Sequence, residues 1–187
     1  MKTYKLITLA IAGATFWASC SESTENKMEN TADSLSAKME RGMDNIRESD
    51  DEDFLDDAVE ANTMELKTLM LGQQKGGKEV KGHASHMIAD HKKLGDDVWA
   101  YLAKKNIQLN DLDTAGTDTD LSNKAAGRDF DKAFADKMVR DHEKVIDLFE
   151  EGMNEVKDPE LKDLISKALP TLRSHLEMSR EMQSKFK

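Results

Sequence analysis

The sequence predicts an all-α protein built as a four-helix bundle. In four long segments, apolar residues recur at three- and four-residue spacing, which is the period of an amphipathic helix. These segments are residues 51–73, 78–105, 125–156 and 159–186. No stretch alternates apolar and polar residues as a half-buried strand does, and aromatic residues make up only 5% of the chain. Four amphipathic helices of this length bury their apolar faces by packing into a bundle.

Turn and capping residues separate the four segments. Gly76-Gly77 stands between the first and the second, and Asp158-Pro159 opens the fourth, with Asp at the capping position and Pro in the first turn. Residues 106–124 are rich in Asp, Thr, Asn and Gly, which predicts a long loop between the second and third helices. The pattern leaves open whether this loop crosses the bundle or folds back.

Pro170 lies inside the fourth segment. Proline has no amide hydrogen to donate within a helix, and its ring collides with the carbonyl group four residues earlier. We therefore expect the fourth helix to kink or break about one turn before His175.

The N-terminus has the pattern of a secretory signal peptide. Two lysines precede an apolar run from Leu6 to Trp17, which is too short to span a bilayer as a helix. Cys20, the only cysteine, stands where a lipid-modified cysteine is expected, although Trp17 takes a position that is usually aliphatic. A buried free thiol is the alternative for Cys20. We predict a signal peptide (1–19), a lipid-anchored polar tether with a short helix (20–50) and a bundle domain (51–187).

The charge of the chain restricts its partners. The sequence has 37 acidic and 27 basic residues, and removing residues 1–19 takes away Lys2 and Lys5, which leaves 25 bases and a net charge of −12. Nucleic acids and anionic membrane surfaces both repel such a protein, so we expect no nucleic-acid partner and membrane contact only through acyl chains on Cys20. We expect an exported protein of the cell envelope, at the periplasmic or surface face of the outer membrane. An envelope protein partner and the oligomeric state stay open.

One short motif occurs twice. Met-aliphatic-x-Asp-His-x-Lys-aliphatic stands at residues 87–94 and again at 138–145, and each copy carries a histidine, His91 or His142, on the apolar stripe of its helix. An imidazole among apolar residues costs free energy unless a partner bonds or ligates it. The motif therefore predicts a buried polar site.

Each helix places one titratable residue on its apolar stripe: Glu65, His91, His142 and His175. Counting residues from the helix ends brings the three histidines to one level near the middle, and puts Glu65 one to two turns closer to an end. Three imidazoles and a carboxylate are ligands for a transition metal such as zinc, iron or copper. A structural hydrogen-bond network among the same residues is the alternative, and the sequence does not decide between them.

Signatures of catalysis are missing from the sequence. It has no Gly-rich phosphate loop, no paired cysteines and no Gly-x-Ser-x-Gly motif, so a non-enzymatic role is favoured over an enzyme of unknown substrate. Glu-x-x-His, which di-iron enzymes place on two bundle helices, is absent, because Ile88, Val139 and Leu172 stand three residues before the histidines. Asp90 and Asp141 point about 100° away from the neighbouring histidines, so we expect them to be supporting or surface groups.

Four ordered motifs between Asp53 and Met182 carry a resemblance to a known family. They are Phe54 with Glu65-Leu66, Val80-Lys81 with Met87 to His91, Phe130-Asp131 with Met138 to His142, and Leu169 to Leu176. The chain resembles the bacterial ferritin-like domain of unknown function 4142, found in predicted lipoproteins and exported proteins. The resemblance implies a ferritin-like bundle and supports Glu65 and the three histidines as matched polar positions. The chain departs from the family at His83, where an aromatic residue is usual.

Overall fold

The computed structural model describes residues 50–109 and 118–187. The chain divides into two units, Met1–Gly42 and Met43–Lys187, and all described residues belong to the second. The predicted signal peptide, Cys20 and the tether with its short helix lie outside the described residues. Within the described ranges there are helices and no strand, so the predicted all-α bundle is confirmed.

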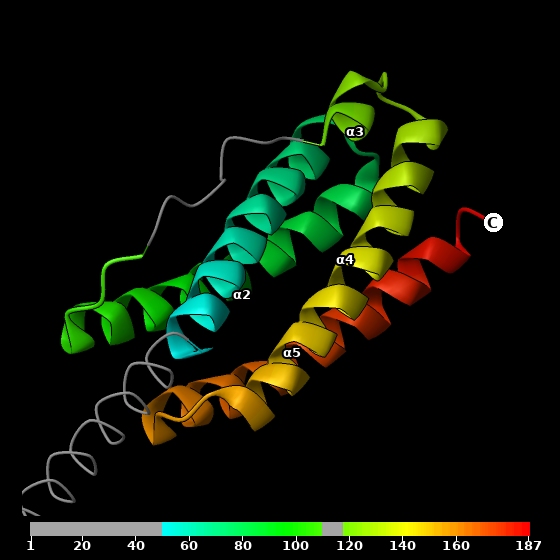
Figure 1. Cartoon of the computed structure of the whole chain (residues 1–187). Helices are drawn as coiled ribbons and strands as arrows, with labels where there is room; N and C mark the ends of the chain where they lie inside the picture. Colours follow the sequence, from blue (N-terminus) through cyan, green and yellow to red (C-terminus); the bar gives the residue numbers. More distant parts are fainter. Residues whose placement is uncertain (1–49, 110–117) are drawn as a thin grey trace, which may run out of the picture. The chain divides into compact units, whose positions relative to one another are not determined.

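Four long helices and one short helix make up this unit (Figure 1). The first helix covers residues 50–75, followed by α2 (Lys78–Lys105), α3 (Thr119–Asn123), α4 (Arg128–Glu155) and α5 (Pro159–Ser184). The short α3 lies inside the segment that we expected to be a loop. None of the helices in the described ranges combines the length and the apolar character needed to cross a membrane.

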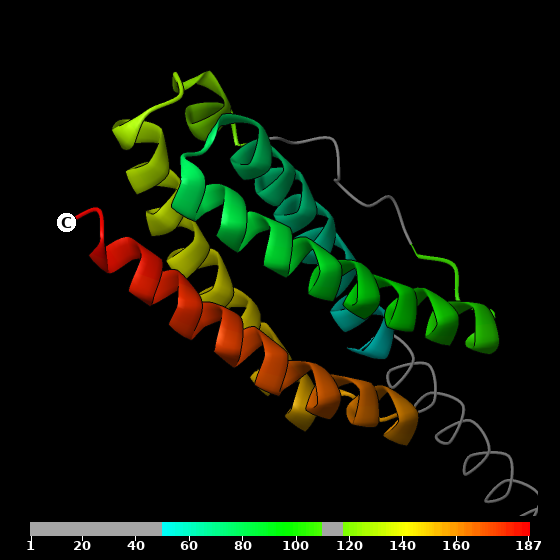
Figure 2. The same cartoon turned by 180° about the vertical axis from the view of Figure 1, so that it is seen from behind.

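The long connection joins opposite ends of the bundle. At one end, the amide of Gly77 before α2 donates a hydrogen bond to Asp131 Oδ1 near the start of α4 (2.9 Å). At the other end, Lys104 near the end of α2 pairs with Glu160 in the first turn of α5 (2.6 Å). Helices α2 and α4 therefore run in the same direction, as Figures 1 and 2 show from two sides. The connection between the second and third helices therefore crosses the bundle and does not fold back, which the sequence left open. One long crossover is the connectivity of ferritin-like bundles.

Local chemistry sets the helix ends. The side chain of Asp158 accepts hydrogen bonds from the amides of Glu160 and Leu161, which caps α5 at its predicted start. Helix α2 ends at Asn106, which takes the left-handed conformation (φ 57°). Helix α4 begins at residue 128 rather than the predicted 125, since Gly127 has φ 138°, a conformation that side-chain-bearing residues rarely adopt.

Helix α5 continues through Pro170. Of the two predicted outcomes, the break is therefore wrong, and the kink stays a prediction. Pro170 and Ser166, whose carbonyl group loses its helical donor, are both exposed, so water can hydrate that carbonyl group and the helix tolerates the proline.

The core consists of two apolar clusters with a polar layer between them. The first cluster includes Phe54, Val59, Val98, Ile146, Phe149 and Leu172. The second includes Leu69, Met87, Phe130, Phe134, Met138 and Met182. On every long helix the chain passes from one cluster to the other through one of the four predicted site residues. The clusters therefore hold the four helices in register around this polar layer.

Candidate metal centre

The polar layer contains one buried titratable residue from each of the four long helices. Glu65, His91, His142 and His175 are respectively 6%, 4%, 2% and 1% exposed. They lie on the first helix, α2, α4 and α5. Placing four polar groups at this depth is costly unless each finds a partner.

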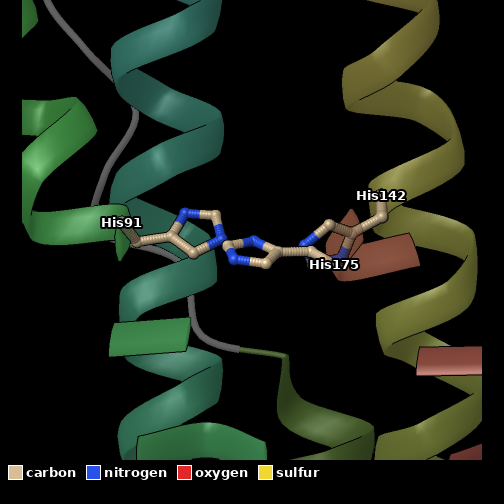
Figure 3. Close-up of side chains that lie close together, drawn as sticks. All are labelled: His91, His142 and His175. Atoms are coloured by element: carbon tan, nitrogen blue, oxygen red, sulfur yellow. The ribbon is translucent and has the colours of Figure 1, made fainter. Parts of the chain in front are cut away.

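The three histidines face one another across the bundle (Figure 3). One ring nitrogen from each of His91, His142 and His175 lies within 4.8 Å of the other two. The ring centroids are 5.2 Å apart for His91 and His175, 5.5 Å for His142 and His175, and 5.7 Å for His91 and His142. Three buried histidines in this arrangement could hold a metal ion.

Each histidine donates a hydrogen bond from one ring nitrogen to an oxygen atom. Nδ1 of His91 lies 2.9 Å from Oδ1 of Asn62, and Nε2 of His175 lies 3.0 Å from Oδ2 of Asp90. Nδ1 of His142 lies 2.9 Å from the backbone carbonyl oxygen of Met138, one turn earlier. Since these oxygens accept, the proton of each neutral ring sits on the nitrogen that makes this bond.

The remaining nitrogens have no hydrogen-bond partner. They are Nε2 of His91, Nε2 of His142 and Nδ1 of His175, and all three are buried. Each carries a free lone pair, because the proton of its ring is on the other nitrogen. An unsatisfied buried polar atom costs about 1–3 kcal/mol, so three together are a large cost for the core of one small domain.

Burial keeps the three rings neutral. Burial, and then the neighbouring His142 and His175, lower the pKa of His91 to about 3. Burial also lowers the pKa of His142 to about 4, although its bond to the Met138 carbonyl acts in the opposite direction. The pKa of His175 is lowered by burial as well, against the effect of Asp90. At neutral pH the cluster therefore presents lone pairs rather than positive charges.

Glu65 lies beside the cluster. Its Oε1 is 3.8 Å from Nδ1 of His142, which is too long for a hydrogen bond, and that nitrogen already donates to Met138. Burial, and then the nearby Asp141, raise the pKa of Glu65 to about 8. The pair is therefore a neutral carboxyl group next to a neutral ring at pH 7, and Oε1 of Glu65 is buried without a partner. The structure groups the three histidines with one another and places Glu65 at their edge.

Sequence reasoning foresaw part of the supporting shell. Asp90 is a supporting group, but it holds His175 of α5 rather than its own neighbour in sequence. Asn62, which holds His91, was missed, because a half-buried asparagine on a helix has no distinguishing spacing. The Met138 carbonyl could not be found either, since its role depends on the rotamer of His142.

The fold and the site together define the class of protein: an all-α bundle with one long crossover connection and three buried histidines close to one another. Residues 21–182 match the family described as Domain of unknown function (DUF4142). The match covers most of the 187 residues, and the chain belongs to this family. The family that the motifs resemble is therefore confirmed. No curated protein matches the chain in sequence.

A solved structure with the same fold is that of a conserved hypothetical protein, rv2844, from Mycobacterium tuberculosis. The two chains are 14% identical, the TM-score is 0.62, and the match covers 74% of this chain and 93% of the other. At this identity the likeness extends to the fold alone.

Proposed function

We propose that this protein is a lipid-anchored protein of the cell envelope whose helical bundle binds a transition metal ion. The ligands are the free nitrogens of His91, His142 and His175. Glu65 is the fourth polar group of the site and supplies a carboxyl beside the ion. Two observations carry the proposal: the three buried histidines bring ring nitrogens within 4.8 Å of one another, and each ring has one buried nitrogen without a hydrogen-bond partner among the described residues.

The hydrogen bonds around the histidines support metal binding. In protein metal sites, a ligating histidine usually donates its other ring N–H to a carboxylate, a carbonyl group or a water, which fixes the ring orientation. Here a carboxylate (Asp90), a side-chain amide (Asn62) and a backbone carbonyl (Met138) play this part for the three rings.

A structural network explains the same geometry less well. Such a network would pair the inner nitrogens with donors, but none of the three has one. Two lone pairs that face each other cannot form a hydrogen bond, whereas a cation accepts all three at once. This removes the cost of three unsatisfied atoms, which a purely structural arrangement would leave in place.

Imidazole nitrogens suit zinc, copper and iron, of which zinc and copper bind them with high affinity. A metal–nitrogen distance of about 2.0–2.1 Å in tetrahedral geometry needs nitrogens about 3.4 Å apart. The present separations of up to 4.8 Å require the rings to move inward by roughly 1 Å. Side-chain rotation can supply a shift of this size.

The test is the metal content of the purified protein, measured by elemental mass spectrometry after adding zinc, ferrous iron or copper. We expect about one equivalent in the natural protein and a loss in a His91→Gln, His142→Gln double variant. Lys92→Gln is the matched control, because Lys92 is an exposed residue next to His91 on the same helix. A metal-free natural protein would instead support the alternative of a structural or interaction module.

The lipid anchor needs its own test, since Cys20 lies outside the described residues. We expect the protein to incorporate labelled palmitate in a bacterial host and to partition with the membrane fraction. Cys20→Ala should abolish both. Release of the unlabelled natural protein into the soluble fraction would contradict the anchor without touching the metal proposal.

A further inference from the structure

A cavity of about 50 Å³ adjoins the histidine cluster. Its polar lining consists of Asn62, Thr63, Glu65, His91, Asp141 and His142. Most of the other lining residues are apolar, among them Ala58, Val98 and Phe149. One water needs about 10–15 Å³ of such space, so the cavity holds about three or four groups of that size.

The cavity lies on one side of the cluster. His91 and His142 line it, and His175 does not. Three histidines leave a tetrahedral ion with one free position, which in many metal sites is taken by water or another small ligand. The cavity is the space next to the cluster where such a ligand can be accommodated.

Glu65 marks a second contact point for a ligand. It lines the cavity, is 6% exposed, and its Oε1 has no hydrogen-bond partner. A buried carboxyl oxygen without a partner is expected to bond to something that enters the space beside it. Glu65 is thus placed to contact a ligand that the histidine-bound ion would hold.

We propose that the cavity binds a small inorganic ligand of up to four non-hydrogen atoms, held by the metal ion at one end and by a hydrogen bond with Glu65. This proposal rests on the metal site proposed above. The apolar walls favour ligands with little charge to hydrate. A volume of about 50 Å³ suits a ligand of this size, so we expect the site to prefer small ligands to larger organic molecules.

The experiment uses cobalt(II) as the metal, because its visible absorption reports a change of ligands. Azide, with three atoms, and imidazole, with five ring atoms, are the probes. We expect azide to change the absorption of the cobalt-loaded protein saturably, and imidazole to leave it unchanged. An equal response to imidazole would overturn selection by size.

Two variants test the cavity and the carboxyl. Ala61 lines the cavity, and Ala61→Leu should fill part of it and weaken azide binding by about tenfold or more. Ala103→Leu, an exposed position on α2, is the matched control. Glu65→Met keeps the length of the side chain and removes its carboxyl group, and its cobalt content shows whether Glu65 is itself a ligand of the ion.

The outcomes separate the two proposals. A protein that takes up no cobalt refutes the metal site, and the ligand site with it. A protein that binds cobalt but does not respond to azide keeps the metal site and overturns the ligand site. If Glu65→Met no longer binds cobalt, Glu65 is itself the fourth ligand and the ligand site is likewise overturned.

Discussion

Asp90 on α2 accepts a hydrogen bond from Nε2 of His175 on α5, at 3.0 Å. This bond fixes the proton on the outer nitrogen of His175 and leaves Nδ1 free toward the cluster. Asp90 is 40% exposed, whereas His175 is 1% exposed, so a carboxylate at the surface orients a ring in the core. In metal sites such supporting residues are a large part of the affinity.

We therefore expect Asp90→Ala to weaken metal binding about 10- to 100-fold while the helical fold is kept. The ring of His175 would lose its acceptor and could hold its proton on the inner nitrogen. Competition with a chromogenic chelator gives the affinity, and circular dichroism checks the fold. Asp96→Ala removes an exposed carboxylate from the same helix and should have no effect. Equal losses in both variants would point to the charge of the surface instead of the bond.

Glu65 makes the stability of the metal-free protein depend on pH. Its pKa is raised to about 8 in the folded state, while the unfolded side chain ionises near 4.5. Between these values the folded state holds one proton more, so the free energy of unfolding falls as pH rises. Histidines of the unfolded chain, with pKa values near 6.5, hold part of their protons up to about pH 7.5, whereas folding lowers the pKa values of His91 and His142 to well below this range. The slope between about pH 7.5 and 8.5 therefore reports Glu65.

Urea unfolding at several pH values measures this slope. We expect the metal-free natural protein to lose stability between about pH 7.5 and 8.5, and Glu65→Gln, which stays neutral, to lose less over the same range. Parallel curves for the two proteins would show that Glu65 is ionised in the folded state at neutral pH.

The fold and the three histidines of the site could be predicted from the sequence, because the signals for them lie within single helices. Helix α2 matches the predicted range of 78–105, because Gly77 and Asn106 are helix-ending residues at its two limits. His91 and His142 could be found because the apolar stripe makes an imidazole stand out. Counting along the helices then brought His175 to the same level.

What the sequence could not supply depends on contacts between helices. The bond between Asn62 and His91 joins residues 29 positions apart, and no periodic pattern marks it. The direction of the long connection depends on which helix ends meet, which became clear from Gly77 and Asp131. Counting placed Glu65 too near an end, yet it reaches His142 to within 3.8 Å, at the edge of the group.

Metal binding should release a proton from Glu65. At pH 7 the carboxyl is protonated in the metal-free protein, since its pKa is about 8. A divalent cation nearby favours the ionised form, and the neutral histidines have no inner proton to release. Calorimetry of zinc binding in two buffers with different ionisation enthalpies counts the protons. We expect close to one for the natural protein and none for Glu65→Gln; equal counts would place the proton elsewhere.

Pro170 tests whether the middle of α5 is strained for the sake of the site. Proline removes one hydrogen bond from the helix, and replacing it with alanine restores that bond, which raises the free energy of unfolding. The replacement also makes the unfolded chain more flexible, which offsets part of this gain. Together we expect Pro170→Ala to raise the free energy of unfolding by about 1–2 kcal/mol. Pro159→Ala is the matched control, because Pro159 stands in the first turn of α5, where no such bond is lost, and the change there should be small. Urea unfolding of both variants gives the two values.

His175 follows Pro170 by little more than one turn, so metal content is measured on the same samples. A more stable Pro170→Ala protein with weakened metal binding would mean that the proline sets the direction of His175, whereas unchanged binding would leave the position of that ring to Asp90 and the packed core.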